Sequence, residues 1–295
     1  MPRKASQTDS PLIDAMEPLA DYESAASVLK QFLSFPLDDS TPIFQMFLQL
    51  PGAVQSRGRR PMERFVYVPG AREDRVLLIA HTDTVWDAHY KNPVSAAVLE
   101  EKDGYLCSGS PSAGIGADDR AGCAALWLLR NSGHSLLLAD GEEYRHWGAR
   151  FLLRTQRRLL RELNRHCYLV ELDLPGSLEY SFKGVAVTKR FERFIQQQGY
   201  RQTACKGGTD LRFLSRGRCG VNLSIGFYRQ HTPREVIAAR TWYENCRQVH
   251  RMLQPRQTPY PWSFFGFLKL RLRAILNKGK RGLQRLWKHS SVKRA

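Results

Sequence analysis

Residues 75–87 read RVLLIAHTDTVWD, an apolar run that ends directly at His81 and Asp83. A short apolar run bounded by polar and turn-forming residues predicts a buried β-strand. Four further runs share this character: RFVYV (64–68), HSLLLA (134–139), CYLVEL (167–172) and VNLSIGFY (221–228). Longer amphipathic stretches predict helices at Tyr22 to Phe35, Ala121 to Arg130, Trp147 to Leu163, Thr188 to Gln198 and Pro233 to Leu253. This alternation predicts an α/β protein, a three-layer αβα sandwich around a mixed, mostly parallel central sheet.

The length of 295 residues suits one large domain with short appendages. We predict an N-terminal helical lead-in over residues 1–60, a main domain over 61–255 and a basic amphipathic tail over 256–295. Apolar residues make up 42% of the chain, and six cysteines lack CxxC spacing, so we expect a folded protein with reduced thiols. The N-terminus has no apolar signal region and no run is long enough to span a membrane, which predicts a cytoplasmic location.

The net charge of +17 is concentrated near the C-terminus, where Lys269 to Arg294 contains ten Lys and Arg and no Asp or Glu. On a helical wheel this segment has one apolar stripe: Phe265, Leu268, Leu272, Ile275, Leu276, Leu283, Leu286 and Trp287. Such a helix suits an anionic membrane surface, which would place the protein peripherally on the membrane, or packing on the domain or on a protein partner. Gly279 and Gly282 interrupt it and weaken the membrane interpretation. Nucleic-acid binding is the least favoured alternative, because the charge belongs to an appendage.

Polar residues gather where the predicted strands end. The segments are His81 with Asp83, Asp118 with Asp119, Glu142 with Glu143, Glu171 with Asp173, and His231. Each has a simple structural explanation by itself, such as a turn, a helix cap or a solvated loop. Ligands bind beyond the carboxyl ends of strands in open α/β sheets, so the joint occurrence of all five segments predicts one shared site.

The motifs HTD, GADDRAG, DGEE, ELD, GGTD and HTPRE occur in this order over about residues 64 to 253. In that order they resemble the co-catalytic metallopeptidases, a family that includes zinc aminopeptidases, desuccinylase-like deacylases and glutamate carboxypeptidases. Only 57 residues lie between Asp173 and His231, too few for the lid domain that many relatives insert there. The resemblance therefore implies a compact, lidless form of the family.

The resemblance also implies a role for each motif residue. His81 and Asp173 would bind one metal ion, Glu143 and His231 a second, and Asp118 would bridge the two. Asp83 would orient His81, and Glu142 would act as the general base. The GGTD motif (Gly207 to Asp210) would line the substrate side through Gly208, Thr209 and Asp210, although a plain turn also explains it.

The residue types fit this chemistry, because two close divalent cations need a shared carboxylate to offset their repulsion. Mixed nitrogen and oxygen ligands suit zinc, with cobalt or manganese as alternatives. A metal-bound water has its pKa lowered toward about 7, and a carboxylate can take its proton as it attacks a carbonyl. We therefore expect hydrolysis of a peptide or amide bond.

Three alternatives stay open: a non-catalytic binding protein on the same fold, an N-acyl amino acid deacylase, and a single-metal acyl transferase or cyclase. One departure bears on substrate preference. DGEE continues as YRHWGA, where relatives typically have a glycine-rich turn, so the pocket beside Glu142 and Glu143 is expected to be reshaped.

Overall fold

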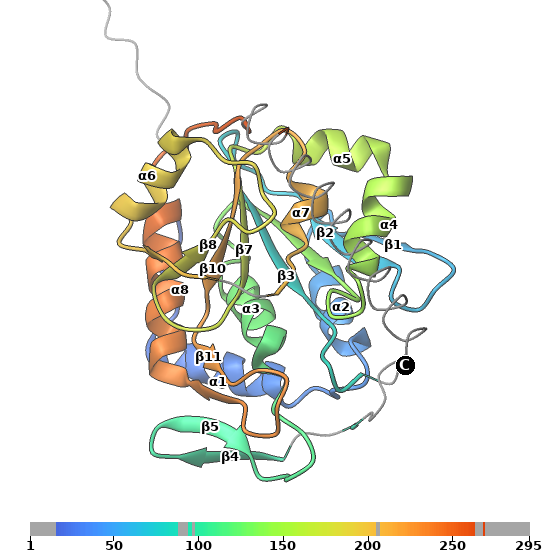
Figure 1. The fold of residues 1–295 in the computed structure, drawn as a ribbon, viewed down its shortest axis with the longest axis vertical. Coiled ribbons are helices and arrows are strands. Elements are labelled where there is room, and N and C mark those ends of the chain that lie inside the picture. Colours follow the sequence, from blue (N-terminus) through green and yellow to red (C-terminus); the bar gives the residue numbers. More distant parts are fainter. Residues whose placement is uncertain (1–15, 88–93, 96–97, 205–206, 263–267, 269–295) are drawn as a thin grey trace, which may run out of the picture.

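A computed structural model of the chain describes residues 16–87, 94–95, 98–204, 207–262 and 268. The described part contains a large central sheet with helices on both of its faces (Figure 1). The helices are α1 (Tyr22–Leu33), α2 (Thr41–Leu48), α3 (Ala117–Leu128), α4 (Trp147–Thr155), α5 (Arg157–Leu163), α6 (Lys189–Gln197), α7 (Leu211–Leu214) and α8 (Ala239–Leu253). The strands are β1 (Val54–Arg57), β2 (Arg64–Val68), β3 (Leu77–His81), β4 (Leu99–Lys102), β5 (Tyr105–Ser108), β6 (Ser135–Ala139), β7 (Leu169–Leu174), β8 (Glu179–Ser181), β9 (Arg201–Gln202), β10 (Gly220–Ser224), β11 (Phe227–Tyr228) and β12 (Val236–Ala238).

The central sheet has eight described strands in the order β1-β2-β6-β3-β7-β10-β8-β9. The four strands at its centre, β6, β3, β7 and β10, are parallel to one another. Antiparallel pairs join β1 to β2, β2 to β6 and β10 to β8. The predicted mixed, mostly parallel sheet is confirmed.

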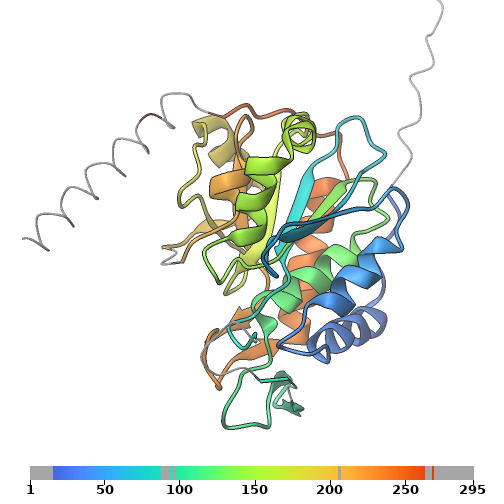
Figure 2. The ribbon, with the colours of Figure 1, turned by 90° about the vertical axis from the view of Figure 1, so that its right-hand side faces the viewer.

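Alternation along the central strands separates the protein into layers. Leu78 and Ala80 of β3 join the core cluster that contains α1, α3 and α8, whereas Leu77 and Ile79 join the cluster that contains α4, α5 and α7. Strand side chains point alternately to the two faces of a sheet, so a strand buried on both faces must be apolar throughout. Figure 2 shows the two helical layers on either side of the sheet. The three-layer αβα sandwich is therefore confirmed.

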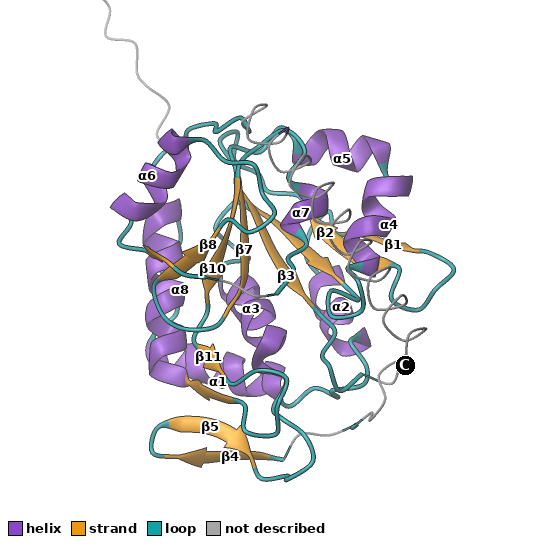
Figure 3. Cartoon of the chain, viewed as in Figure 1, coloured by secondary structure: helices purple, strands orange, loops and turns teal. Residues whose placement is uncertain are grey.

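A smaller antiparallel sheet, β11-β12-β5-β4, lies beyond one end of the central sheet (Figure 3). It accounts for two differences from the sequence prediction. The run at residues 221–228 divides at Gly226, whose φ of +100° lets β10 end in the central sheet and β11 begin in the small one. Residues 236–238 are strand β12, paired with β5, so the helix predicted from Pro233 begins only at Ala239.

The helix predicted from Trp147 to Leu163 is also divided. It breaks at Gln156, where φ is −107° and ψ is 61°, into α4 and α5. The remaining predicted strands and helices have counterparts in the structure within a few residues.

The structure describes most of the predicted N-terminal lead-in but little of the predicted C-terminal tail. Helices α1 and α2 contribute buried side chains to the same core cluster as α3 and α8. The apolar stripe predicted in the tail lies outside the described residues except for Leu268, so the tail and the division at residues 60 and 255 stay predictions. Within the described residues no helix is long and apolar enough to cross a membrane. Between Asp173 and His231 the described strands β8 to β11 belong to the two sheets.

Candidate metal centre

His81 is the last residue of β3, and its imidazole is almost fully buried. Its Nδ1 lies 3.3 Å from Oδ1 of Asp83 and 3.1 Å from the backbone carbonyl of Asp83. The carboxylate of Asp83 accepts hydrogen bonds from the backbone N–H groups of Glu142, at 2.9 Å, and of Glu143, at 3.1 Å. Asp83 therefore joins the loop after β6 to the imidazole at the end of β3, and Nε2 of His81 faces the other acidic residues.

Asp118 stands between two histidines. Its Oδ1 is 3.0 Å from Nε2 of His81, and its Oδ2 is 3.1 Å from Nε2 of His231. The neighbouring Asp119 has a different task, because its oxygens accept from the backbone N–H groups of His81 and Gly122, at 3.1 Å and 3.0 Å. Each oxygen of Asp118 thus faces a separate imidazole. The carboxylate of Asp119 instead connects the start of α3 to the end of β3 through hydrogen bonds.

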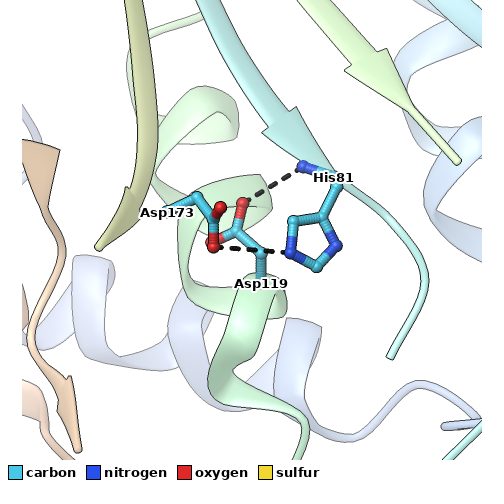
Figure 4. A group of neighbouring side chains, drawn as sticks. All are labelled: His81, Asp119 and Asp173. Atoms are coloured by element: carbon cyan, nitrogen blue, oxygen red, sulfur yellow. Dashed lines mark hydrogen bonds and ion pairs between the residues drawn. The ribbon is translucent and has the colours of Figure 1, made fainter. Parts of the chain in front are cut away.

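Asp173 and Glu143 extend this arrangement on its two sides. Oδ1 of Asp173, from β7, is 3.4 Å from Nε2 of His81 (Figure 4). Oε1 of Glu143 is 2.5 Å from Nε2 of His231. One set therefore comprises His81, Asp118 and Asp173, and the other comprises His231, Asp118 and Glu143.

A pocket of about 300 Å³ opens onto these side chains. Asp118, Glu142, Glu143, Asp173 and His231 line it. His81 lies behind them, whereas the side chain of His231 is 46% exposed. The pocket gives a ligand access to both sets.

The crowding of carboxylates shifts the pKa values of the groups in the centre. Burial and then the charge of Asp118 raise the pKa of Glu143 to about 7. Burial lowers the pKa of His231, but its close contacts with Asp118 and Glu143 outweigh that and raise the pKa to about 11. The pKa of Asp173 rises well above its usual value for the same two reasons as that of Glu143. The centre therefore requires positive charge.

Divalent cations fit this requirement. Metal ligands bind as neutral imidazole and ionised carboxylate, so a cation replaces the protons that these groups otherwise hold. His81, Asp118 and Glu143 each present a ligand atom, and these atoms lie within 4.8 Å of one another. His81, Asp119 and Asp173 form a similar group (Figure 4), but the backbone hydrogen bonds of Asp119 occupy its oxygens. The mixed nitrogen and oxygen donors suit zinc-type ions.

The residues of the GGTD motif lie in two different environments. Gly208 lies in the wall of the pocket. Thr209 and Asp210 are buried behind it, where the hydroxyl of Thr209 and the backbone N–H of Asp210 donate to the carboxylate of Glu171. Contact of Thr209 and Asp210 with substrate stays a prediction.

Two residues that the sequence reasoning did not assign belong to the surroundings of the centre. Glu235 is buried and accepts from the backbone N–H groups of Gly116, at 2.7 Å, and of Asp118, at 3.0 Å. His146 contacts both Glu142 and Asp210. Glu235 belongs to the HTPRE motif and falls within the helix predicted from Pro233, and the YRHWGA departure is the one signal in the sequence for His146.

No protein-family model matches the chain, and no curated protein matches it. Solved structures do. Aminopeptidase PepT from Bacillus cereus is 14% identical, with a TM-score of 0.59 over 79% of this chain and 98% of that one. A tripeptidase from Staphylococcus aureus is 12% identical, with a TM-score of 0.60 over 80% of this chain and 99% of that one. An aminopeptidase from the archaeon Desulfurococcus kamchatkensis is 10% identical, with a TM-score of 0.55 over 80% and 96%.

The chain shares the fold of these peptidases. At such identities the likeness is one of fold, and it confirms the fold that the motif resemblance implied. Within this fold, four of the five segments contribute side chains to one pocket, and His81 contacts two of those side chains, Asp118 and Asp173.

Proposed function

We propose that the protein is a metal-dependent hydrolase of peptide or amide bonds, an exopeptidase of the aminopeptidase-like type. One observation carries the proposal: the Asp118 carboxylate turns one oxygen to Nε2 of His81 and the other to Nε2 of His231. A carboxylate shared in this way is what two neighbouring divalent cations require. A cap of α3 or a lone structural ion pair requires only one of these contacts.

The two ligand sets follow from this geometry. His81, Asp173 and one oxygen of Asp118 would hold one cation, and His231, Glu143 and the other oxygen of Asp118 would hold the second. Zinc fits the donors, and cobalt or manganese fits them too. When bound, the cations would supply Lewis acidity that makes water a better nucleophile and polarises the substrate carbonyl.

Glu142 is the group we assign to proton transfer. Its backbone N–H is held by Asp83, and its side chain lies in the pocket beside Glu143 and Asp118. From there its carboxylate takes a proton from the attacking water and returns it to the leaving amine. Asp83 positions two of these residues. Its carboxylate accepts a hydrogen bond from the backbone of Glu142 and lies against the imidazole of His81.

Peptides are the favoured substrates, because the solved structures of the same fold are named as aminopeptidases and a tripeptidase. N-acyl amino acids are the alternative, since the same centre would cleave either amide. A panel that contains aminoacyl-p-nitroanilides, short peptides with free or blocked N-termini, and N-acyl amino acids separates these classes.

The test compares the zinc-loaded wild-type chain with Glu142→Gln, which keeps the shape of the side chain and removes its basicity. We expect kcat to fall about 10²- to 10⁴-fold, the range for loss of a general base, while the metal content stays unchanged. Glu244→Gln, at a half-exposed position of α8, serves as the matched control and should keep full activity.

Unchanged turnover in Glu142→Gln would remove Glu142 from the mechanism. A wild-type chain that binds zinc but cleaves no member of the panel would favour the alternative of a non-catalytic binding protein.

A further inference from the structure

We propose that His146 is a positioning residue: clamped by Asp210, its imidazole holds the carboxylate of Glu142 in one orientation beside the pocket. The inference rests on the proposed function, because it gives Glu142 a task that needs a fixed orientation. It concerns residues outside both ligand sets.

The contacts of His146 carry the proposal. Its Nδ1 lies 3.1 Å from Oε1 of Glu142 and 3.0 Å from Oδ1 of Asp210. The imidazole is 13% exposed, and the side chain of Asp210 is fully buried. One ring nitrogen therefore joins a carboxylate that lines the pocket to a carboxylate inside the protein.

Asp210 and its neighbour Thr209 are in turn anchored to the buried carboxylate of Glu171. The backbone N–H of Asp210 donates to Oε1 of Glu171 at 3.0 Å, and the hydroxyl of Thr209 donates to the other oxygen. Oδ2 of Asp210 is buried with no hydrogen-bond partner among the described residues. An unpaired buried carboxylate is costly, so the contact between Oδ1 and His146 is strongly favoured.

The surroundings leave the imidazole little freedom. A Cβ atom on Gly208 would lie 2.5 Å from Nε2 of His146, so glycine is needed for the ring to pack where it does. The ring of Phe213 contacts the imidazole with a centroid distance of 5.2 Å. The backbone of His146 has a φ of 58° at the start of α4.

The charge of the imidazole agrees with this geometry. Burial lowers the pKa of His146, but the hydrogen bonds with Asp210 and Glu142 outweigh it and raise the pKa to about 10. The ring is then an imidazolium near neutral pH and donates from Nδ1. A charged donor strengthens such contacts, which reduces the rotamer freedom of the Glu142 side chain.

The assignment links two features of the sequence. The YRHWGA departure supplies the imidazole, and the GGTD motif supplies the glycine that makes room for it and the aspartate that clamps it. Asp210 then acts through His146 on the general base.

The test uses the full chain loaded with zinc and three variants. His146→Gly removes the imidazole without placing a Cβ at positive φ, and His146→Asn restores a neutral N–H donor in a residue that tolerates this φ. Arg145→Gly is the matched control, since Arg145 also has a positive φ, of 68°, in the same turn and is exposed.

We expect kcat of His146→Gly to fall about 10- to 100-fold, the scale for misplacement of a catalytic group, with KM within about threefold of wild type. His146→Asn should recover most of the loss, and Arg145→Gly should match wild type. A kcat of His146→Gly within about twofold of wild type, or equal losses in the glycine and asparagine variants, would overturn the proposal.

A second readout is independent of activity. Nitrogen-15 NMR of the zinc-loaded chain should show a proton on Nδ1 of His146, and Glu142→Gln and Asp210→Asn should each shift its signal. An unprotonated Nδ1, or a signal that ignores both substitutions, would overturn the proposal. If the wild type proves inactive, the proposed function fails, and the NMR result alone decides whether His146 holds Glu142.

Discussion

Replacing Glu235 with alanine removes the acceptor of two backbone N–H groups in the loop that carries Asp118. Glu235 is 1% exposed, and its oxygens accept from Gly116 at 2.7 Å and from Asp118 at 3.0 Å. A buried donor left without a partner costs about 1–3 kcal/mol, so the loss of both should lower the free energy of unfolding by about 2–6 kcal/mol. The loop that presents Asp118 should also lose its fixed position.

Urea unfolding of the metal-free chain measures the first effect. Glu235→Gln keeps one acceptor oxygen and turns an amide N–H₂ toward the other donor, so about half of the loss, about 1–3 kcal/mol, is expected. Glu244→Ala, at a half-exposed position of α8, should stay within about 0.5 kcal/mol of wild type.

Metal titration measures the second effect, and we expect zinc affinity to fall about 10- to 100-fold in Glu235→Ala, as for other residues that orient ligands. The reasoning is refuted if Glu235→Ala unfolds within about 0.5 kcal/mol of wild type and binds zinc with unchanged affinity.

Two further predictions concern other parts of the protein. Gly208→Ala should lower kcat without loss of zinc, because its Cβ would lie 2.5 Å from Nε2 of His146; a variant as active as wild type would contradict this packing. Burial lowers the pKa of His134 to about 4, and its ring accepts from the N–H of Val76 and contacts the carbonyl of Leu253. Because that folded pKa lies below the unfolded value near 6.5, stability is present above pH 6.5 and is lost as the pH falls toward 4, by about 2 kcal/mol at pH 5. His134→Gln should reduce this loss in urea unfolding compared between pH 7 and pH 5, and an unchanged pH dependence would count against it.

The central sheet could be predicted because its strands are buried on both faces. Four apolar residues in a row, as in β6 (Ser135–Ala139) and β3 (Leu77–His81), leave few alternatives to a buried strand. The helix predicted from Pro233 failed because Val236 and Ile237 pair with β5, a contact distant in sequence that a local pattern does not contain. The break between α4 and α5 at Gln156 could not be predicted, because no glycine or proline occurs at that position.

The centre could be predicted in part for a related reason. The parallel strands β3 and β7 bring His81 and Asp173 to one edge of the sheet, so residues at strand ends meet whatever their separation in sequence. Two neighbouring contacts could not be predicted: Glu235 accepts from the backbone N–H of Asp118, and His146 contacts the carboxylate of Glu142. Both contacts depend on how loops cross, which cannot be read from a single sequence.

The central claim is that Asp118 bridges two cations, and metal content measured by mass spectrometry of the protein equilibrated with zinc tests it most directly. The wild-type chain should bind two zinc ions, and Asp118→Asn, which keeps the size of the side chain and loses its charge, should bind at most one. Tight binding of two ions by both proteins would contradict the bridge, and a wild-type chain that binds none would contradict the metal centre itself.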